Sequence, residues 1–176
     1  MSDMFTSPKR PFFRSTDKLT LEVLPEQTYY QFAHKWFQSI NTKFPEDVFH
    51  TIYSMVSGYT GYIQKVLNRL YELQPNEVTD ELVKESIDFI IKREEDDFRR
   101  LYALLTNNQA QVLKAIAKEQ IVASPTSQAF IKKYNLPAAS SVKRAIDFLN
   151  DYEYIYPTKD GYIVYERFMA IWLQRM

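Results

Sequence analysis

The sequence YIYPTKDGYIVY occupies residues 154–165 and decides the fold class. Two short runs rich in β-favouring residues, 154–156 and 162–165, flank the pair Asp160-Gly161. An Asp-Gly pair between such runs is a strong hairpin signal, because both residues accept the backbone conformation of a tight turn. The pattern therefore predicts a β-hairpin close to the C-terminus of this 176-residue chain.

Helical patterns precede the hairpin. Apolar residues recur at helical spacing in three stretches, near residues 110–117, 129–134 and 140–149. Pro125 and Pro137 separate these stretches, and the third is expected to bury Val142, Ala145, Ile146 and Leu149. A helix, a helix–turn–helix and a hairpin follow one another in winged-helix domains. We therefore assign residues 107–176 to a winged-helix domain.

Residues 25–106 predict a compact four-helix bundle. The first helix carries one apolar stripe, which consists of Tyr29, Phe32, Ala33, Trp36, Phe37 and Ile40. Further stripes cover residues 48–56, 59–70 and 82–91, and Gly58 is expected to end the second helix. The fold class is therefore mainly α with a small β-hairpin.

Residues 1–24 do not read as the start of an independent domain. Leu19, Leu21 and Val23 alternate with polar residues, which predicts a strand over residues 18–24. A lone strand needs neighbours. Two interpretations stay open: an arm packed on the helices, or the last strand of a missing sheet, in which case a longer parent protein or a split gene is expected.

Composition excludes several classes of site. Three glycines in total cannot supply a glycine-rich phosphate loop, and the absence of cysteine removes disulfides, thiolate zinc sites and thiol nucleophiles. The 22 basic and 22 acidic residues cancel, although residues 110–176 hold nine Lys/Arg against six acids. With no long apolar stretch, the sequence favours a cytoplasmic protein without membrane contact.

The acidic run at residues 94–97 invites a metal-site interpretation. Such runs are usually solvated helix faces, and Arg93, Arg99 and Arg100 lie at ion-pairing distance along a helix. We therefore expect no metal site. No pattern of nucleophile and base points to catalysis either, so the chain by itself is not expected to be an enzyme.

Several stretches together carry a resemblance that covers nearly the whole chain. They are FTSPKRPFFRST (5–16), GYTGYIQ (58–64), LKAIA (113–117), ASSV (139–142) and GYIVYERFMAIWL (161–173). This set resembles the C-terminal half of archaeal-type P-loop ATPases, a branch of the AAA+/STAND superfamily. In that resemblance the first stretch closes the nucleotide-binding core, the second opens a helical lid, and the last is the closing wing and tail.

The resemblance implies roles that apply to an intact parent protein. The Walker motifs of the family are absent here, so no cofactor is expected in this chain, whereas the parent would bind ATP and magnesium. The implied nucleotide contacts are Gly58, Thr60 and Tyr62, with Arg69 as a phosphate sensor. The implied partner is an upstream ATPase core or another protein.

Two functions remain open for the winged helix. As an interaction or regulatory module it would use aromatic side chains of the wing and tail, such as Tyr156, Tyr162 and Trp172. As a DNA-binding regulator, with the helical part for dimerisation or sensing, it would use a set of basic and polar residues. That set is Lys132, Lys133, Ser140, Lys143, Arg144 and Lys159. Three acids on or just after the third helix, Asp147, Asp151 and Glu153, favour the interaction module.

Overall fold

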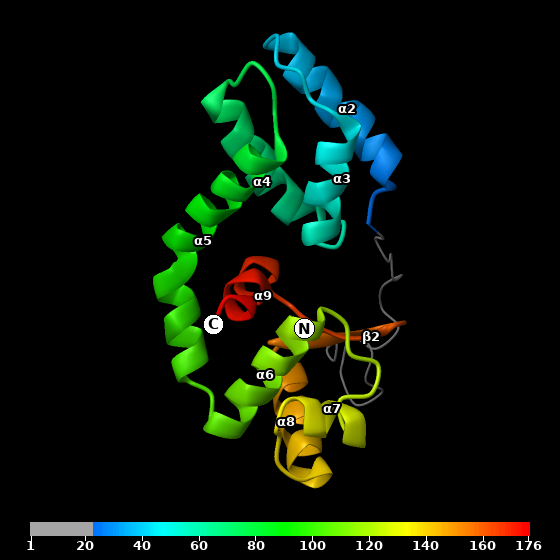
Figure 1. Cartoon of the computed structure of the whole chain (residues 1–176), viewed down its shortest axis with the longest axis vertical. Helices are drawn as coiled ribbons and strands as arrows, with labels where there is room; N and C mark the ends of the chain where they lie inside the picture. Colours follow the sequence, from blue (N-terminus) through cyan, green and yellow to red (C-terminus); the bar gives the residue numbers. More distant parts are fainter. Residues whose placement is uncertain (1–22) are drawn as a thin grey trace, which may run out of the picture.

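The computed structural model describes residues 23–176 (Figure 1). The helices of the first half are α2 (Glu26–Ser39), α3 (Glu46–Met55), α4 (Thr60–Leu73) and α5 (Asp80–Ala103). The second half contains α6 (Asn107–Glu119), α7 (Gln128–Lys133), α8 (Ala139–Asp151), β1 (Ile155–Thr158), β2 (Gly161–Val164) and α9 (Arg167–Gln174). The predicted fold class, mainly α with a C-terminal hairpin, is confirmed.

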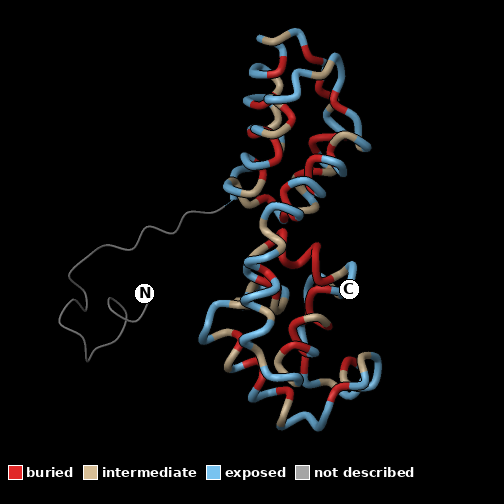
Figure 2. The backbone as a smooth tube through the Cα atoms, turned by 90° about the vertical axis from the view of Figure 1, so that its left-hand side faces the viewer, coloured by how far each residue is buried: buried red, intermediate tan, exposed pale blue. Residues whose placement is uncertain are grey.

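Aromatic packing forms the core of the first half. The ring centroids of Phe37 in α2 and Phe44 lie 4.6 Å apart. The ring of Phe49 in α3 meets that of Tyr29 edge to face, with 5.7 Å between the centroids. The loops at the far end are joined by backbone hydrogen bonds, because Lys43 N–H donates to the carbonyl of Asn76 and the carbonyl of Lys43 accepts from Val78. Buried residues line the inner sides of both halves (Figure 2).

Helix α5 runs along one side of the molecule and connects the two halves (Figure 1). Its N-cap is Thr79, whose side chain accepts from the Leu82 N–H and satisfies one of the unpaired donors of the first turn. Phe98, near its C-terminal end, is buried against α9.

The second half has the order predicted for a winged helix. Helix α6 packs against α8, and the antiparallel pair β1–β2 follows α8 directly. A bridge between Val122 and Tyr162 adds a single-residue third strand to the hairpin. Gly161 permits this approach, because a Cβ there would lie 2.5 Å from the Val122 backbone and its φ is +140°.

The hairpin differs in detail from the prediction. Thr158 pairs with Gly161, so the turn consists of Lys159 and Asp160 alone, and Gly161 begins the returning strand. The strands are therefore shifted inward from the predicted runs.

The predicted apolar stripe lies on helix α2 but is only partly buried. Tyr29, Ala33 and Phe37 are buried, whereas Phe32 and Trp36 are 56% and 54% exposed. The described neighbours of α2 cover only part of its apolar surface.

Helix α9 was not predicted. All its residues from Arg167 to Leu173 are buried, so the segment has no polar face to set a helical period. It lies between α5 and α6 and contacts both (Figure 1).

Most of the predicted strand at residues 18–24 lies outside the described residues. Val23 and Leu24 are described; both are exposed and neither belongs to a strand. The division of the chain at residues 24/25 and 106/107 stays a prediction. Among the described residues, no helix combines the length and apolar character needed to cross a membrane.

Candidate functional site

Helix α8 occupies the position of the recognition helix in a winged helix. Its inward residues are the four predicted ones, Val142, Ala145, Ile146 and Leu149. Its exposed face carries Ser140, Lys143, Arg144, Asp147 and Asp151. Sequence periodicity therefore placed every one of these side chains on the correct side of the helix.

The charges on this face largely cancel. Lys143 forms an ion pair with Asp147 one turn later, and this hydrogen bond raises the pKa of Lys143. Arg144 donates to the Oγ of Ser141 at 3.3 Å, and Asp151 adds a second exposed carboxylate at the end of the helix. Two cations and two anions thus share the surface that would face a nucleic acid.

The two lysines of α7 differ in their surroundings. Lys133 pairs with Glu119 of α6, a contact that raises the pKa of Lys133 and lowers that of Glu119. The hydroxyl of Tyr134 donates to the same carboxylate at 2.7 Å. Lys132 is exposed at the end of α7. Only one of the two predicted phosphate contacts therefore extends into solvent without an acidic partner in the described part of the chain.

Lys159 forms the tip of the wing together with Asp160. The basic residues of the DNA hypothesis thus come from α7, from α8 and from the β1–β2 turn. The structure exposes all of them.

The junction between the two halves is built around α9. The guanidinium group of Arg167, which is 5% exposed, donates to the carbonyl of Val164 at 3.1 Å and to the Oγ of Ser57 at 2.9 Å. Its Nε has no hydrogen-bond partner among residues 23–176. Burial accordingly lowers the pKa of Arg167. A buried cation therefore links the wing to the α3–α4 loop.

Tyr62 of α4 lies beside this cation. Its ring meets Phe168 edge to face at 5.4 Å between centroids, and its hydroxyl donates to the carbonyl of Tyr165 at 3.4 Å. Burial raises the pKa of Tyr62 to about 12. The side chain is consequently a neutral part of the contact between α4 and the winged helix.

Glu166 is a partly buried carboxylic acid in the same junction. It caps α9 by accepting from the Met169 N–H, yet burial raises the pKa of its carboxyl group. The neighbouring carboxylate of Glu94 raises this pKa further, while Lys65 lowers it. Ionisation of Glu166 therefore works against the packed junction.

The predicted interaction aromatics are not all at the surface. Trp172 is only 7% exposed and packs between Phe98 and Tyr102 of α5, so its assignment as an exposed anchor was wrong. Tyr156 is half-buried against Tyr59 at 6.1 Å, and Tyr162 is also half-buried. These aromatics are already used in packing within the chain.

The residues implied to contact a nucleotide lie along α4. Gly58 precedes the helix and is buried, and a Cβ there would lie 2.7 Å from the Tyr53 side chain. Thr60 begins the helix, and its carbonyl accepts from the hydroxyl of Tyr29 at 3.4 Å. Arg69 lies two and a half turns later, about 13 Å along the axis from Thr60. Gly58, Thr60 and Tyr62 are close in sequence, but Thr60 contacts α2 through its carbonyl whereas the ring of Tyr62 packs on Phe168 of α9, and Arg69 lies apart from both.

Arg69 lines a shallow cleft of about 300 Å³ between α4 and α5. Its guanidinium group stacks on Phe89 at 4.0 Å and lies 3.6 Å from Glu72. Arg93 lies on the same ring at 5.8 Å. The arginine is therefore held by local contacts of α4 and α5.

The acidic run forms ion pairs, as the sequence suggested. Glu95 pairs with Arg99 at 2.6 Å and accepts from the indole of Trp172, and Asp97 lies 3.4 Å from Arg100. Glu94 pairs with Lys65 of α4, a partner that helical spacing could not reveal. Among residues 23–176, no cluster of side chains has the make-up of a metal site.

Sequence reasoning missed the residues of the junction. Ser57 precedes Arg167 by 110 residues, and neither Ser57 nor the Glu166-Arg167 pair forms a pattern that indicates a contact between them. The one usable signal was Arg167 next to an unbroken apolar run, because a charge beside such a run is buried with it if the run is a core helix.

Comparison with known proteins bears on the second half of the chain. Residues 96–175 match a family model described as "Probable winged helix domain". Searches of curated proteins and of solved structures gave no match. The match begins within α5 and includes Phe98 and Tyr102, which pack on α9. Topology and family model agree that residues 96–175 carry a winged helix domain.

Proposed function

We propose that this chain is a non-catalytic interaction and regulatory module whose winged helix binds protein surfaces rather than duplex DNA. The observation that carries the proposal is the composition of the α8 face. There, Lys143 is paired with Asp147, and Asp151 offsets Arg144. A helix that enters the major groove needs to attract phosphates, and two carboxylates at its surface repel them.

The packing of α9 supports the same proposal. The side chains of Phe168 and Arg167 contact α4 and the α3–α4 loop, and Arg175 pairs with Asp88 of α5 at 2.5 Å. The winged helix thus uses one apolar and charged surface for protein contact within its own chain. Movement at this junction would couple the helical half to whatever the winged helix binds.

The resemblance to archaeal-type ATPases extends the proposal to a parent protein. In that setting the helical half is the lid, Gly58, Thr60 and Tyr62 face the nucleotide, and Arg69 senses phosphate. Tyr62 would then contact both the nucleotide and Phe168, which gives a route from nucleotide to winged helix. A Walker A motif encoded in frame upstream of Met1 would support this extension, and a stop codon in that frame would contradict it. A cytoplasmic location belongs to the same proposal.

A DNA-binding regulator is the second candidate. It is favoured by the winged helix domain itself and by the exposure of Lys132, Arg144 and Lys159 on three elements of that domain. Residues 107–176 also carry nine Lys/Arg against six acids. The two candidates differ in the strength and salt dependence of duplex binding.

A titration of the full chain against a labelled 20-bp duplex of mixed sequence tests the choice. We expect the dissociation constant at about 0.15 M salt to be weaker than about 10⁻⁶ M, the tight end of ordinary non-specific binding. Tighter binding that is lost in Lys143→Ala with Arg144→Ala would establish the DNA-binding function. In that case Lys132→Ala with Lys133→Ala should weaken binding to all sequences equally.

Hydrogen exchange tests the protein-contact part of the proposal. Tyr62→Ala removes the ring that meets Phe168, and we expect faster exchange of the α9 amides while those of α8 stay unchanged. Tyr62→Phe keeps the ring and is the matched control, with exchange close to that of the natural chain. Unchanged exchange of the α9 amides in Tyr62→Ala would mean that the contact between Tyr62 and Phe168 does not stabilise α9.

A further inference from the structure

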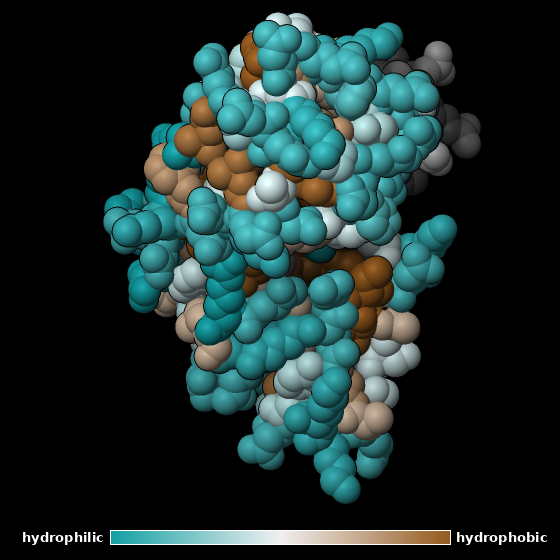
Figure 3. Space-filling model, turned by 45° about the horizontal axis from the view of Figure 1, so that its top comes forward, coloured by the Kyte–Doolittle hydropathy of each residue, from teal (hydrophilic) through white to brown (hydrophobic). Residues whose placement is uncertain are grey.

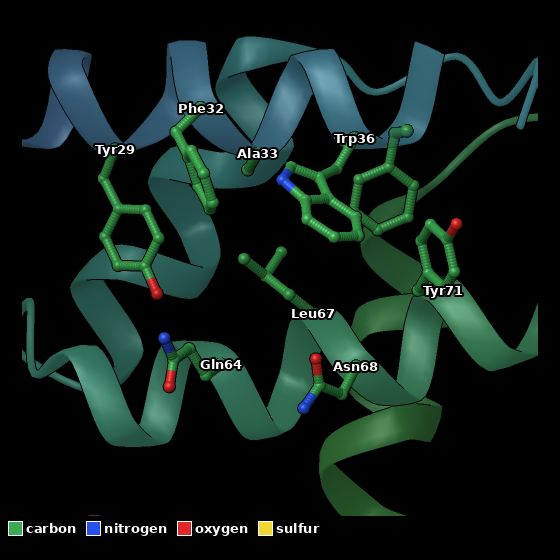
Figure 4. A pocket seen from close by; sticks show the side chains of 9 residues that line it. Tyr29, Phe32, Ala33, Trp36, Gln64, Leu67, Asn68 and Tyr71 are labelled. Atoms are coloured by element: carbon green, nitrogen blue, oxygen red, sulfur yellow. The ribbon is translucent and has the colours of Figure 1, made fainter. Parts of the chain in front are cut away.

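A row of aromatic side chains, of which Phe32 and Trp36 are more than half exposed, runs along the outer side of the first half. Tyr29, Phe32 and Trp36 of α2 follow one another with ring centroids 6.5 Å and 6.2 Å apart, and Tyr71 of α4 continues the row 6.0 Å beyond Trp36. Figure 4 shows these rings above the amide side chains of Gln64 and Asn68. Together they line a groove of about 340 Å³ between α2 and α4.

The groove continues towards the start of the described chain. A neighbouring hollow is lined by Leu24 and Thr28 and shares Tyr29, Phe32 and Gln64 with the main groove. The described chain therefore starts, at Val23 and Leu24, at the end of the hollow that continues the groove. Figure 3 shows further apolar surface in the hollow between the two halves, on a separate part of the molecule.

The groove has the chemistry that recognises extended proline-containing peptides. Aromatic rings in a row pack on proline rings, while Gln and Asn side chains can donate to and accept from peptide groups that a polyproline II segment leaves unpaired. The side chains of Gln64 and Asn68, which belong to α4, make no hydrogen bond to another described residue. Both are exposed at the edge of the groove.

One segment of this chain matches that chemistry. Residues 8–13 read PKRPFF, with two prolines three positions apart and two phenylalanines directly after them. This segment lies outside the described residues. We propose that the groove between α2 and α4 binds residues 8–13 of the same chain.

Chain length permits the contact. Ten residues, 14–23, separate the segment from Leu24, and an extended chain of that length reaches about 33 Å. Tyr29 and Trp36 lie about 10 Å apart along α2, and Tyr71 lengthens the row. Six residues of polyproline II span about 15 Å. The segment can therefore turn back at Leu24 and cover the whole row.

The net charges of the segment and of the helical half have opposite signs, although no charged side chain of the described residues lines the groove itself. Residues 8–14 contain Lys9, Arg10 and Arg14 and no acid. Residues 25–106 carry nine Lys/Arg against thirteen Asp/Glu, an excess of four negative charges. Tethering raises the effective concentration of the segment to the millimolar range, so weak binding is sufficient to fill the groove.

The inference does not rest on the partner of the winged helix. The ATPase resemblance places the same segment at the end of a nucleotide-binding core, away from α2. The two assignments therefore predict different solvent exposure of Trp36 in the full chain.

Trp36 is also the probe for the experiment. The chain has two tryptophans, and the other, Trp172, is buried. Labelling the full chain with 5-fluorotryptophan gives two ¹⁹F resonances, which Trp36→Phe assigns. We expect the Trp36 resonance to show a small solvent isotope shift and weak quenching by acrylamide in the full chain, because the segment covers the ring.

Variants in the segment complete the test. Phe12→Ala with Phe13→Ala should expose Trp36 and raise its quenching by acrylamide at least twofold, while Phe5→Ala, the matched control outside the segment, should change nothing. A synthetic peptide of residues 6–16 should restore protection, and the same peptide with Pro8→Ala and Pro11→Ala should not. Equal exposure of Trp36 in the natural chain and the Phe12/Phe13 variant would overturn the proposal.

Protection of Trp36 that disappears on hundredfold dilution would mean that the bound segment belongs to a second copy of the chain, and this would also contradict the proposal. Neither result affects the conclusion from the duplex titration, so the two proposals can fail independently.

Discussion

Arg167 donates a 2.9 Å hydrogen bond to the Oγ of Ser57, which precedes it by 110 residues. The bond is the polar centre of a junction that is otherwise formed by Tyr62, Phe168 and neighbouring aromatic rings. A buried guanidinium group with so few partners makes each of them valuable, since a lost partner leaves a charged donor without water.

A double-mutant cycle measures this bond. Ser57→Ala should lower the free energy of unfolding by about 1–3 kcal/mol, because it leaves a buried N–H of Arg167 unsatisfied. In an Arg167→Met background the same change should cost less than about 0.5 kcal/mol. Chemical denaturation gives both values. Equal costs in the two backgrounds would show that the bond does not stabilise the junction.

The carboxylates of α8 provide a test of the charge argument. Asp147→Asn with Asp151→Asn should strengthen non-specific duplex binding by about tenfold at 0.05 M salt, and by less at 0.2 M, because two charges that repel phosphates are gone. Asp96→Asn with Asp97→Asn changes the net charge equally on α5 and should have a much smaller effect. Fluorescence anisotropy distinguishes these outcomes, and equal effects of the two pairs would refute a specific role of α8.

Glu166 makes stability depend on pH in an unusual direction. Its pKa is raised on folding, so the folded state holds its proton more tightly than the unfolded state. Stability from this group is present below the ordinary pKa near 4.5 and is lost as the pH rises through the higher folded pKa. Glu95 and Glu119 have pKa values that are lowered on folding. Their contributions to stability are present above pH 4.5 and are lost as the pH falls through the lower folded pKa values.

Glu166→Gln should therefore flatten the upper part of the profile. Thermal denaturation between pH 4 and pH 8 should show that the natural chain loses stability with rising pH in the window above 4.5, and that the variant loses less. Glu95→Gln is the control, and its effect should appear at the acid end. A variant profile parallel to the natural one above pH 4.5 would exclude Glu166 as the cause.

Two glycines allow a matched comparison of backbone constraint. Gly161→Ala places a Cβ 2.5 Å from the Val122 backbone at a φ of +140°, so it should lower the free energy of unfolding by more than about 1 kcal/mol. Gly61→Ala, in the first turn of α4 with open space around it, should raise it by about 0.5–1 kcal/mol. Similar effects of the two substitutions would mean that the Val122–Tyr162 bridge is not part of the stable fold.

The chain alone should neither bind ATP tightly nor hydrolyse it. Its three glycines cannot form a phosphate loop, so the backbone N–H groups that hold nucleotide phosphates are missing. Calorimetry should give no affinity in the micromolar range, and phosphate release should match a mock preparation. Micromolar binding that is lost in Arg69→Ala would instead assign the cleft between α4 and α5 to the nucleotide.

Periodicity predicted those parts of the fold in which one side of an element faces water. The α8 face is an example, since Val142 and Leu149 are buried while Arg144 and Asp147 are exposed. It failed for α9, whose residues 167–173 are all buried, and for α2, where Phe32 and Trp36 belong to the apolar stripe but are more than half exposed. Hydrophobic periodicity alone does not predict how far such residues are buried.

Contacts between distant segments were also out of reach. The Val122 bridge depends on the approach of a single residue to the hairpin, and a one-residue strand has no periodicity. The bond between Ser57 and Arg167 joins two positions with no shared motif. Such pairs depend on how distant segments pack together, and the local sequence around either partner does not encode this packing.

The position of α9 has a consequence for biosynthesis. Phe98 and Tyr102 leave the ribosome about 70 residues before Trp172, the ring that covers them. At 5–20 residues per second, translation leaves that part of α5 uncovered for roughly 4–14 seconds. A nascent chain that stalls in the wing would therefore present an aromatic surface to chaperones, and release of α9 from the exit tunnel would withdraw it.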